Sequence, residues 1–191
     1  MAFNLNEFRN KLVNGGARPS QFEMSVIWPD LVRGLAGVAQ AEQDVRFLCE
    51  ISQIPGEMIN PITVNYFGRQ LKYAGERTWN DLTITILNDE DFKIHKALEK
   101  WMKAVADHPT TVSQFDGGIA SGSYATDFVV TQMSRNSGGS PTQAYKFIGA
   151  WPTNIGDIAL NWGSTDAIET FTCTFAYQWW EAVDPSTGAT L

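Results

Sequence analysis

The residue types that most often carry chemistry are few in this chain and lie far apart. There are two histidines, His95 and His108, and neither has another histidine or a cysteine at the spacing that metal ligands use. His95 lies beside the apolar stripe of a predicted helix, which favours a solvated position over a ligand role. The sequence therefore predicts no metal site and no cofactor.

The common nucleophile and phosphate-binding motifs are also missing. The string GIASG at residues 118–122 resembles a hydrolase elbow, but Ser121 stands one position late and no strand-to-helix pattern surrounds it. No P-loop occurs, and no G-x-G-x-x-G follows a predicted strand. An enzyme is the class that this sequence favours least.

One dense acidic cluster, Asp89, Glu90 and Asp91, has two interpretations. Calcium binding would need a loop with alternating oxygen ligands, whereas acids at the start of a helix suit the positive end of its dipole. An apolar stripe with helical spacing follows at once, so we favour a helix start, with Asn88 or Asp89 as its cap.

The cysteines and the overall composition indicate an ordinary globular protein. Cys49 and Cys173 lie on apolar faces of predicted strands, which favours buried core positions over a disulfide. The N-terminus lacks a signal-peptide pattern and no stretch is long enough to span a bilayer, so we expect a soluble protein made in a reducing cytosol without membrane anchoring. The net charge of -7 argues against a surface that grips nucleic acid.

These residues would be positioned by a chain that alternates mostly with strand periodicity. We expect a single domain over residues 1–191, mainly β with some helix (α+β): an antiparallel β-barrel or sandwich with one long packed helix and a short N-terminal helix. Variable-looking loops are expected at about 30–43 and 134–142, with a C-terminal tail at 182–191. The expected strands cover residues 22–28, 44–51, 62–67, 69–74, 82–86, 124–133, 143–150 and 167–181.

The tryptophans leave a binding function open. Trp151, Trp162, Trp179 and Trp180 could form a sugar-binding surface on a β-sandwich. In the last predicted strand, Trp179 is in phase with the core, whereas Trp180 points to the opposite face. We favour Trp180 being covered by a neighbouring residue or by another subunit over stacking on a ligand.

Three segments, in the same order along the chain, resemble the tail tube protein family of contractile-tailed (myovirus-type) bacteriophages. They are residues 73–89, which run from a hairpin through a core strand toward the helix, residues 151–162, and residues 168–181. The closing YQWWE string at 177–181 is the most specific. The likeness covers about residues 18 to 181.

The resemblance implies a structural virion protein that is assembled in the host cytoplasm. Subunits of this family form hexameric rings that stack into a hollow tube with a fold like that of the type VI secretion tube. The implied partners are other copies, the tail sheath protein, the tape measure protein, the baseplate and tail terminator proteins, and double-stranded DNA in transit without specific binding. A tube subunit of a phage-like injection particle or a baseplate tube-initiator protein is the alternative.

Two sets of residues are candidates for assembly roles. Polar faces of two predicted strands are candidates for the channel lining: Thr83, Thr85, Thr170, Thr172 and Thr174. The projecting hairpin, about 59–75, and its surroundings are candidates for subunit contacts and ring stacking: Asn65, Tyr66, Arg69, Lys72, Arg77, Trp79 and Trp180.

Overall fold

The computed structural model describes residues 5–12, 16–34, 38–106, 124–135 and 139–190 of the chain. Its helices are α1 (Leu5–Lys11), α2 (Asp30–Arg33), α3 (Val38–Leu48) and α4 (Lys93–Val105). Its strands are β1 (Phe22–Val26), β2 (Cys49–Ser52), β3 (Glu57–Tyr66), β4 (Arg69–Trp79), β5 (Leu82–Leu87), β6 (Thr126–Met133), β7 (Pro141–Ile155), β8 (Thr170–Ala176) and β9 (Trp179–Val183). His108 and Ser121, which the sequence does not favour as catalytic residues, lie outside the described residues.

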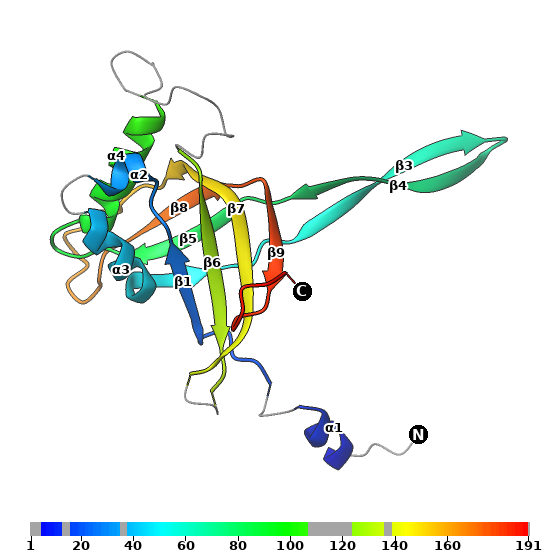
Figure 1. The fold of residues 1–191 in the computed structure, drawn as a ribbon, viewed down its shortest axis with the longest axis horizontal. Coiled ribbons are helices and arrows are strands. Elements are labelled where there is room, and N and C mark those ends of the chain that lie inside the picture. Colours follow the sequence, from blue (N-terminus) through cyan, green and yellow to red (C-terminus); the bar gives the residue numbers. More distant parts are fainter. Residues whose placement is uncertain (1–4, 13–15, 35–37, 107–123, 136–138, 191) are drawn as a thin grey trace.

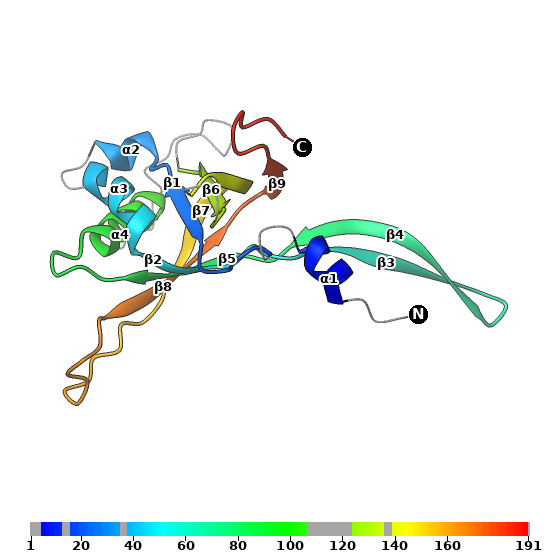
Figure 2. The same cartoon turned by 90° about the horizontal axis from the view of Figure 1, so that it is seen from below.

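Seven strands form one antiparallel sheet in the order β1-β6-β7-β8-β5-β2, with β9 also paired to β7. The 15-residue β7 links two halves of this sheet, because its first part pairs with β9 and its last part with β8. Gly149, with φ of 63°, lies between these two parts. The sheet curls into a nearly closed barrel with α2, α3 and α4 on one side (Figures 1 and 2), so the expected antiparallel β fold is confirmed.

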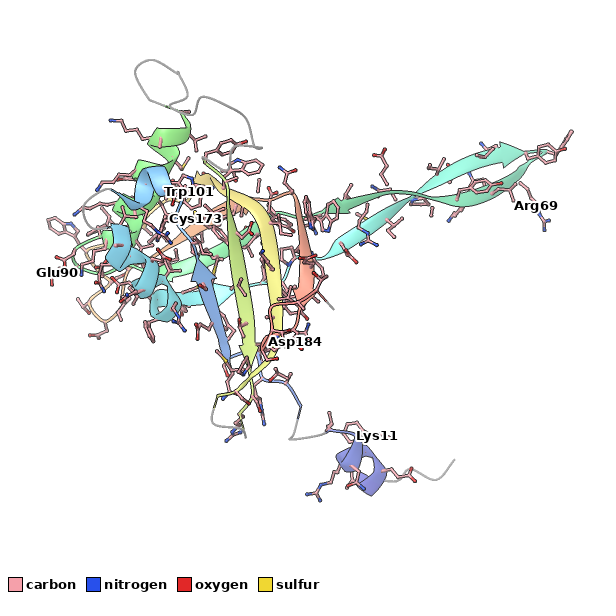
Figure 3. All side chains as sticks on the ribbon, in the orientation of Figure 1. Lys11, Arg69, Glu90, Trp101, Cys173 and Asp184 are labelled. Carbon is pink, nitrogen blue, oxygen red and sulfur yellow. The ribbon has the colours of Figure 1, made fainter. Side chains whose placement is uncertain are left out.

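Large aromatic side chains fill the space between the sheet and α4. Trp101 of α4 is fully buried and makes edge-to-face contacts with Trp28 and Phe128, at ring separations of 5.4 and 6.1 Å. Its indole N–H donates to the Tyr124 carbonyl at 2.8 Å, so burial leaves no unsatisfied hydrogen-bond donor on this side chain. Figure 3 shows Trp101 and Cys173 inside the body. Cys49 and Cys173 are both buried and neither is in a disulfide, as expected.

The prediction of a loop at 30–43 and a strand at 44–51 is wrong. That segment forms α2 and α3, and only Cys49–Ser52 is a strand. Val38, Ala41 and Val45 are buried at helical spacing, whereas Phe47 is 82% exposed. Val45 and Phe47 fit the two-residue period of the strand that follows, but they belong to a longer segment with helical periodicity.

The prediction of one strand over 167–181 is also wrong. The strand is interrupted at Gln178, whose N–H donates to the Ile148 carbonyl at 3.0 Å. There the chain passes from β8 in one half of the sheet to β9 in the other half. This interruption reverses which of the two tryptophans faces the core. Trp179 is 44% exposed, and Trp180 packs against the edge of the core.

The prediction that α4 starts in the acidic cluster is wrong, because Phe92, and not Asn88 or Asp89, stands at its N-cap. The helix begins at Lys93, and an Asp89 carboxylate oxygen accepts the Lys93 backbone N–H at 2.9 Å. The Lys93 ammonium also lies 3.1 Å from the Asp91 carboxylate. The solvated position expected for His95 is wrong, because its ring packs edge-to-face on Phe171 at 5.0 Å and its side chain is only 16% exposed.

Candidate functional site

The described part of the chain contains no cluster of metal-binding side chains. Among those residues, no three His, Cys, Asp or Glu side chains lie close enough to hold a metal ion. No helix there is long and apolar enough to cross a membrane. The features that remain to be explained are exposed surfaces.

The first such surface is the β3–β4 hairpin. It continues the β2–β5 pair and extends far from the body, with Arg69 near its far end (Figures 1 and 3). All ten residues of β3 are exposed. The expected hairpin is therefore confirmed, but it is much longer than the two short strands that the sequence indicated.

The hairpin has one apolar face and one polar face. Directly opposite pairs such as Ile62–Tyr73 and Val64–Leu71 put their side chains on the same face. These four side chains are 45 to 58% exposed, and nothing in the described chain covers them. Because two strands alone do not bury their apolar residues, such a face calls for a covering partner.

The tip of the hairpin is a tight turn with an aromatic residue in an uncommon conformation. Phe67 and Gly68 have φ of 45° and 79°, which defines a two-residue turn with both central residues left-handed. A bulky residue at positive φ carries backbone strain. Phe67 is nevertheless 91% exposed, and among the described rings it contacts only Tyr66, at a centroid separation of 4.5 Å. The contacts described within one copy therefore do not explain why a phenylalanine stands here.

The base of the hairpin is tied to the body. Arg77 lies 3.3 Å from Glu57 across the two strands, and Trp79 is half-buried. The Tyr177 hydroxyl donates to the Asn80 carbonyl. Burial, and secondarily the carboxylate of Asp81, raises the pKa of Tyr177 to about 12, which keeps this donor protonated.

The second surface is the outer face of β5 and β8, which we call the threonine face: Thr83, Thr85, Thr170, Thr172 and Thr174. The structure brings all five together, since Thr83 pairs with Thr174 and Thr85 with Thr172. The hydroxyls of Thr83 and Thr174 are 3.3 Å apart. Their neighbours Ile84 and Cys173 point into the core, so one side of these strands is apolar and the other uncharged and polar.

This half of the sheet carries no positive charge. β2, β5, β8 and residues 151–155 contain no Lys or Arg, and Glu50 is their one charged residue. The threonine face is thus a polar wall without a group that binds phosphate strongly.

The structure groups most, but not all, of the expected contact residues. Asn65, Tyr66, Arg69 and Lys72 lie on the distal hairpin, and Arg77 and Trp79 near its base. Trp180 belongs to β9, where it makes an edge-to-face contact with Tyr145 at a ring separation of 5.7 Å.

The sequence predicted no assembly role for the loop between β7 and β8, and left only Trp162 open as part of a sugar-binding surface. Leu160, Trp162 and Ile168 are 82, 102 and 72% exposed there. The signal that could have found them is a tryptophan flanked by Asn, Gly and Ser, where no strand or helix pattern would bury it.

The fold is the one found in contractile injection systems. The chain superposes on a chain of the sheath/tube terminator of an extracellular contractile injection system with a TM-score of 0.59, covering 86% of this chain and 94% of the other at 12% identity. A chain of the sheath–tube complex of such a system matches with a TM-score of 0.54 over 95% of this chain and 98% of the other, also at 12% identity. The chain therefore shares the fold of these two proteins of contractile injection systems.

The sequence comparison then identifies the family. Residues 17–183 match the phage tail tube protein family, and the chain belongs to it. It is 27% identical to tail tube protein gp19 of Enterobacteria phage T4, over 86% of this chain and 91% of that protein. It is 25% identical to the tail tube protein of Serratia phage KSP90, over 91% and 93%. The chain is thus a structural component of a phage virion.

Proposed function

We propose that six copies form a ring and that rings stack into the hollow tube through which the phage genome passes inside a contractile sheath. The observation that carries this proposal is the β3–β4 hairpin, which presents an uncovered apolar face far from the body. A free monomer would expose that face to water, whereas stacking on the next ring covers it.

Ring closure follows from the edges of the sheet. In the described residues, the sheet ends at β1, at β2 and at β9, which pairs only with β7, and none of these three edges pairs with another strand of the chain. Unpaired edges invite pairing with another chain, and a closed ring of sheets removes them. A head-to-tail contact of this kind closes when the rotation between copies closes.

The threonine face is our candidate for the channel lining. It is polar, which suits a hydrated channel, and its half of the sheet has no cation to hold phosphate. The net charge of -7 per copy, repeated around each ring, would keep DNA from adhering during passage. In this role Thr83, Thr85, Thr170, Thr172 and Thr174 contact water and DNA without binding DNA tightly.

The partners follow from the tube role. Related contractile systems contain a sheath around the tube, a terminator and a tube-terminating cap. We infer that this tube assembles in the host cytoplasm around a tape measure protein, between a baseplate and a terminator, and is enclosed by a sheath. Its role is structural, without catalysis. A tube subunit of an injection particle or a baseplate initiator remains the alternative, which a neighbouring sheath gene would help to distinguish.

Electron microscopy of the purified protein tests the proposal. We expect rings and tubes of uniform width with a hollow centre. A baseplate preparation from the same phage serves as a nucleus if rings alone do not elongate. A protein that stays monomeric at high concentration, with and without that nucleus, would contradict the proposed function.

A further inference from the structure

We propose that residues 156–169, the loop between β7 and β8, form the receptor for the hairpin tip of a second copy in the adjacent ring. We call this segment the receptor loop. The inference rests on the proposed stacking of rings, and it specifies which surface of the next ring the hairpin meets.

The receptor loop and the hairpin lie at opposite ends of the same half of the sheet. At one end Leu82, two residues after the hairpin, pairs with Phe175. At the other end Leu87 pairs with Thr170, which directly follows the receptor loop. Figure 2 shows the two segments extending from the body in different directions. A ring that presents hairpins on one side therefore presents receptor loops on the other, as a repeating head-to-tail contact requires.

The receptor loop has the apolar surface that such a contact needs. The Leu160, Trp162 and Ile168 side chains are almost wholly exposed. The loop also contains a hollow of about 320 Å³, which Leu160 and Ile168 help to line. Polar side chains, among them Asn161 and Ser164, line the rest of this hollow. Exposed tryptophan in such a region is typical of the centre of a protein interface.

The hairpin tip carries a matching protrusion. Phe67 is held outward in a left-handed turn and is 91% exposed, with Tyr66 against it. Strain in a tight turn is kept where it serves a function. We infer that the Phe67 ring of one copy enters the hollow of the receptor loop of the next copy.

Charge points to the same partner. Residues 58–75 of the hairpin carry Arg69 and Lys72 and no acid, whereas the receptor loop carries Asp157, Asp166 and Glu169 and no base. Glu169 accepts a hydrogen bond from Asn88 within its own chain. Among the described residues, no ion pair involves Arg69, Lys72, Asp157 or Asp166. A basic tip and an acidic loop attract one another and fix the direction of stacking.

Charge reversal in the full chain tests this contact. Arg69→Glu with Lys72→Glu reverses the tip, and Asp157→Lys with Asp166→Lys reverses the receptor loop. Each double variant should form normal rings but tubes at least about tenfold shorter at low salt, because like charges then meet across the ring interface. The chain with all four changes should regain tubes. Lys103→Glu, an exposed change on α4, is the control and should leave tube length unchanged.

A second pair of variants tests the apolar part. Trp162→Ser and Phe67→Ser should both keep rings and lose long tubes. Full-length tubes in Trp162→Ser would overturn the receptor loop assignment alone. The same holds if the chain with all four charge changes forms rings but does not regain tubes. Failure of the unchanged protein to form rings would instead overturn the proposed function, and the receptor loop with it.

Discussion

The body of the molecule and the β3–β4 hairpin contain similar apolar residues but bury them very differently. In the body Trp28, Trp101 and Phe175 are at most 1% exposed. In the hairpin no residue of β3 is buried, although Ile62 and Val64 alternate there much as core residues do. Apolar burial stabilises the body within one copy, whereas the hairpin can gain that stabilisation only from another copy. One part of the sequence therefore serves folding and the other serves assembly.

The largest effect should come from the body. Trp101→Ala removes the ring that contacts Trp28 and Phe128, and it removes the hydrogen bond from the indole N–H to the Tyr124 carbonyl. We expect the free energy of unfolding to fall by about 3–5 kcal/mol, measured by urea denaturation of the monomer. A loss under about 1 kcal/mol would show that α4 is not central to the core.

The hairpin should respond in the opposite way. Ile62→Ser with Tyr73→Ser replaces a directly opposite pair on its apolar face. The free energy of unfolding should change by no more than about 0.5 kcal/mol, because both side chains are exposed in the monomer, whereas tubes should be lost. The control, Thr63→Ser with Gln70→Ser at two neighbouring positions of the polar face, should keep its tubes. If the Ile62→Ser, Tyr73→Ser monomer were destabilised as strongly as Trp101→Ala, the hairpin would contribute to folding as the body does, and the distinction between folding and assembly regions would fail.

The base of the hairpin should show an intermediate behaviour. Trp79 is half-buried where the hairpin joins the body. Trp79→Ala should lower the free energy of unfolding by roughly 1–2 kcal/mol. It should also shorten the tubes strongly, because we expect the direction of the whole hairpin to change. Tube length in electron micrographs and urea denaturation measure the two effects. Tubes of normal length in Trp79→Ala would show that Trp79 is not needed for ring stacking.

The smallest effect concerns pH at the same junction. The pKa of Tyr177 is raised from 10.0 to about 12 by burial and by Asp81. The unfolded chain therefore loses this proton first, so the contribution is fully present below pH 10.0 and is lost as the pH rises to about 12. Tyr177→Phe should flatten the pH dependence of unfolding in this window. An unchanged slope would indicate that the Tyr177 hydroxyl is not held at the junction.

Much of the fold could be predicted from local pattern. The alternation in β5 and β8 correctly placed Ile84 and Cys173 inside and the threonines outside. Gly68 correctly marked the hairpin turn, but the length of the hairpin was hidden, because Asn60-Pro61 reads as a turn and here stands at an irregularity in the pairing of β3.

The remaining errors have a shared physical cause. The break between β8 and β9 contains neither Gly nor Pro and arises because the two strands pair with different parts of β7. The receptor loop has no periodicity, so its exposed Trp162 could be recognised only once no neighbour was found to cover it. Both features depend on contacts between segments distant in sequence, which a local pattern does not encode.

A cryo-electron microscopy reconstruction of the assembled tube tests the central claim most directly. We expect rings whose inner wall is the threonine face, with Thr172 toward the channel, and hairpins whose apolar faces are covered by the adjacent ring. Rings with the threonine face turned outward, or hairpins that extend uncovered into solvent, would contradict the account.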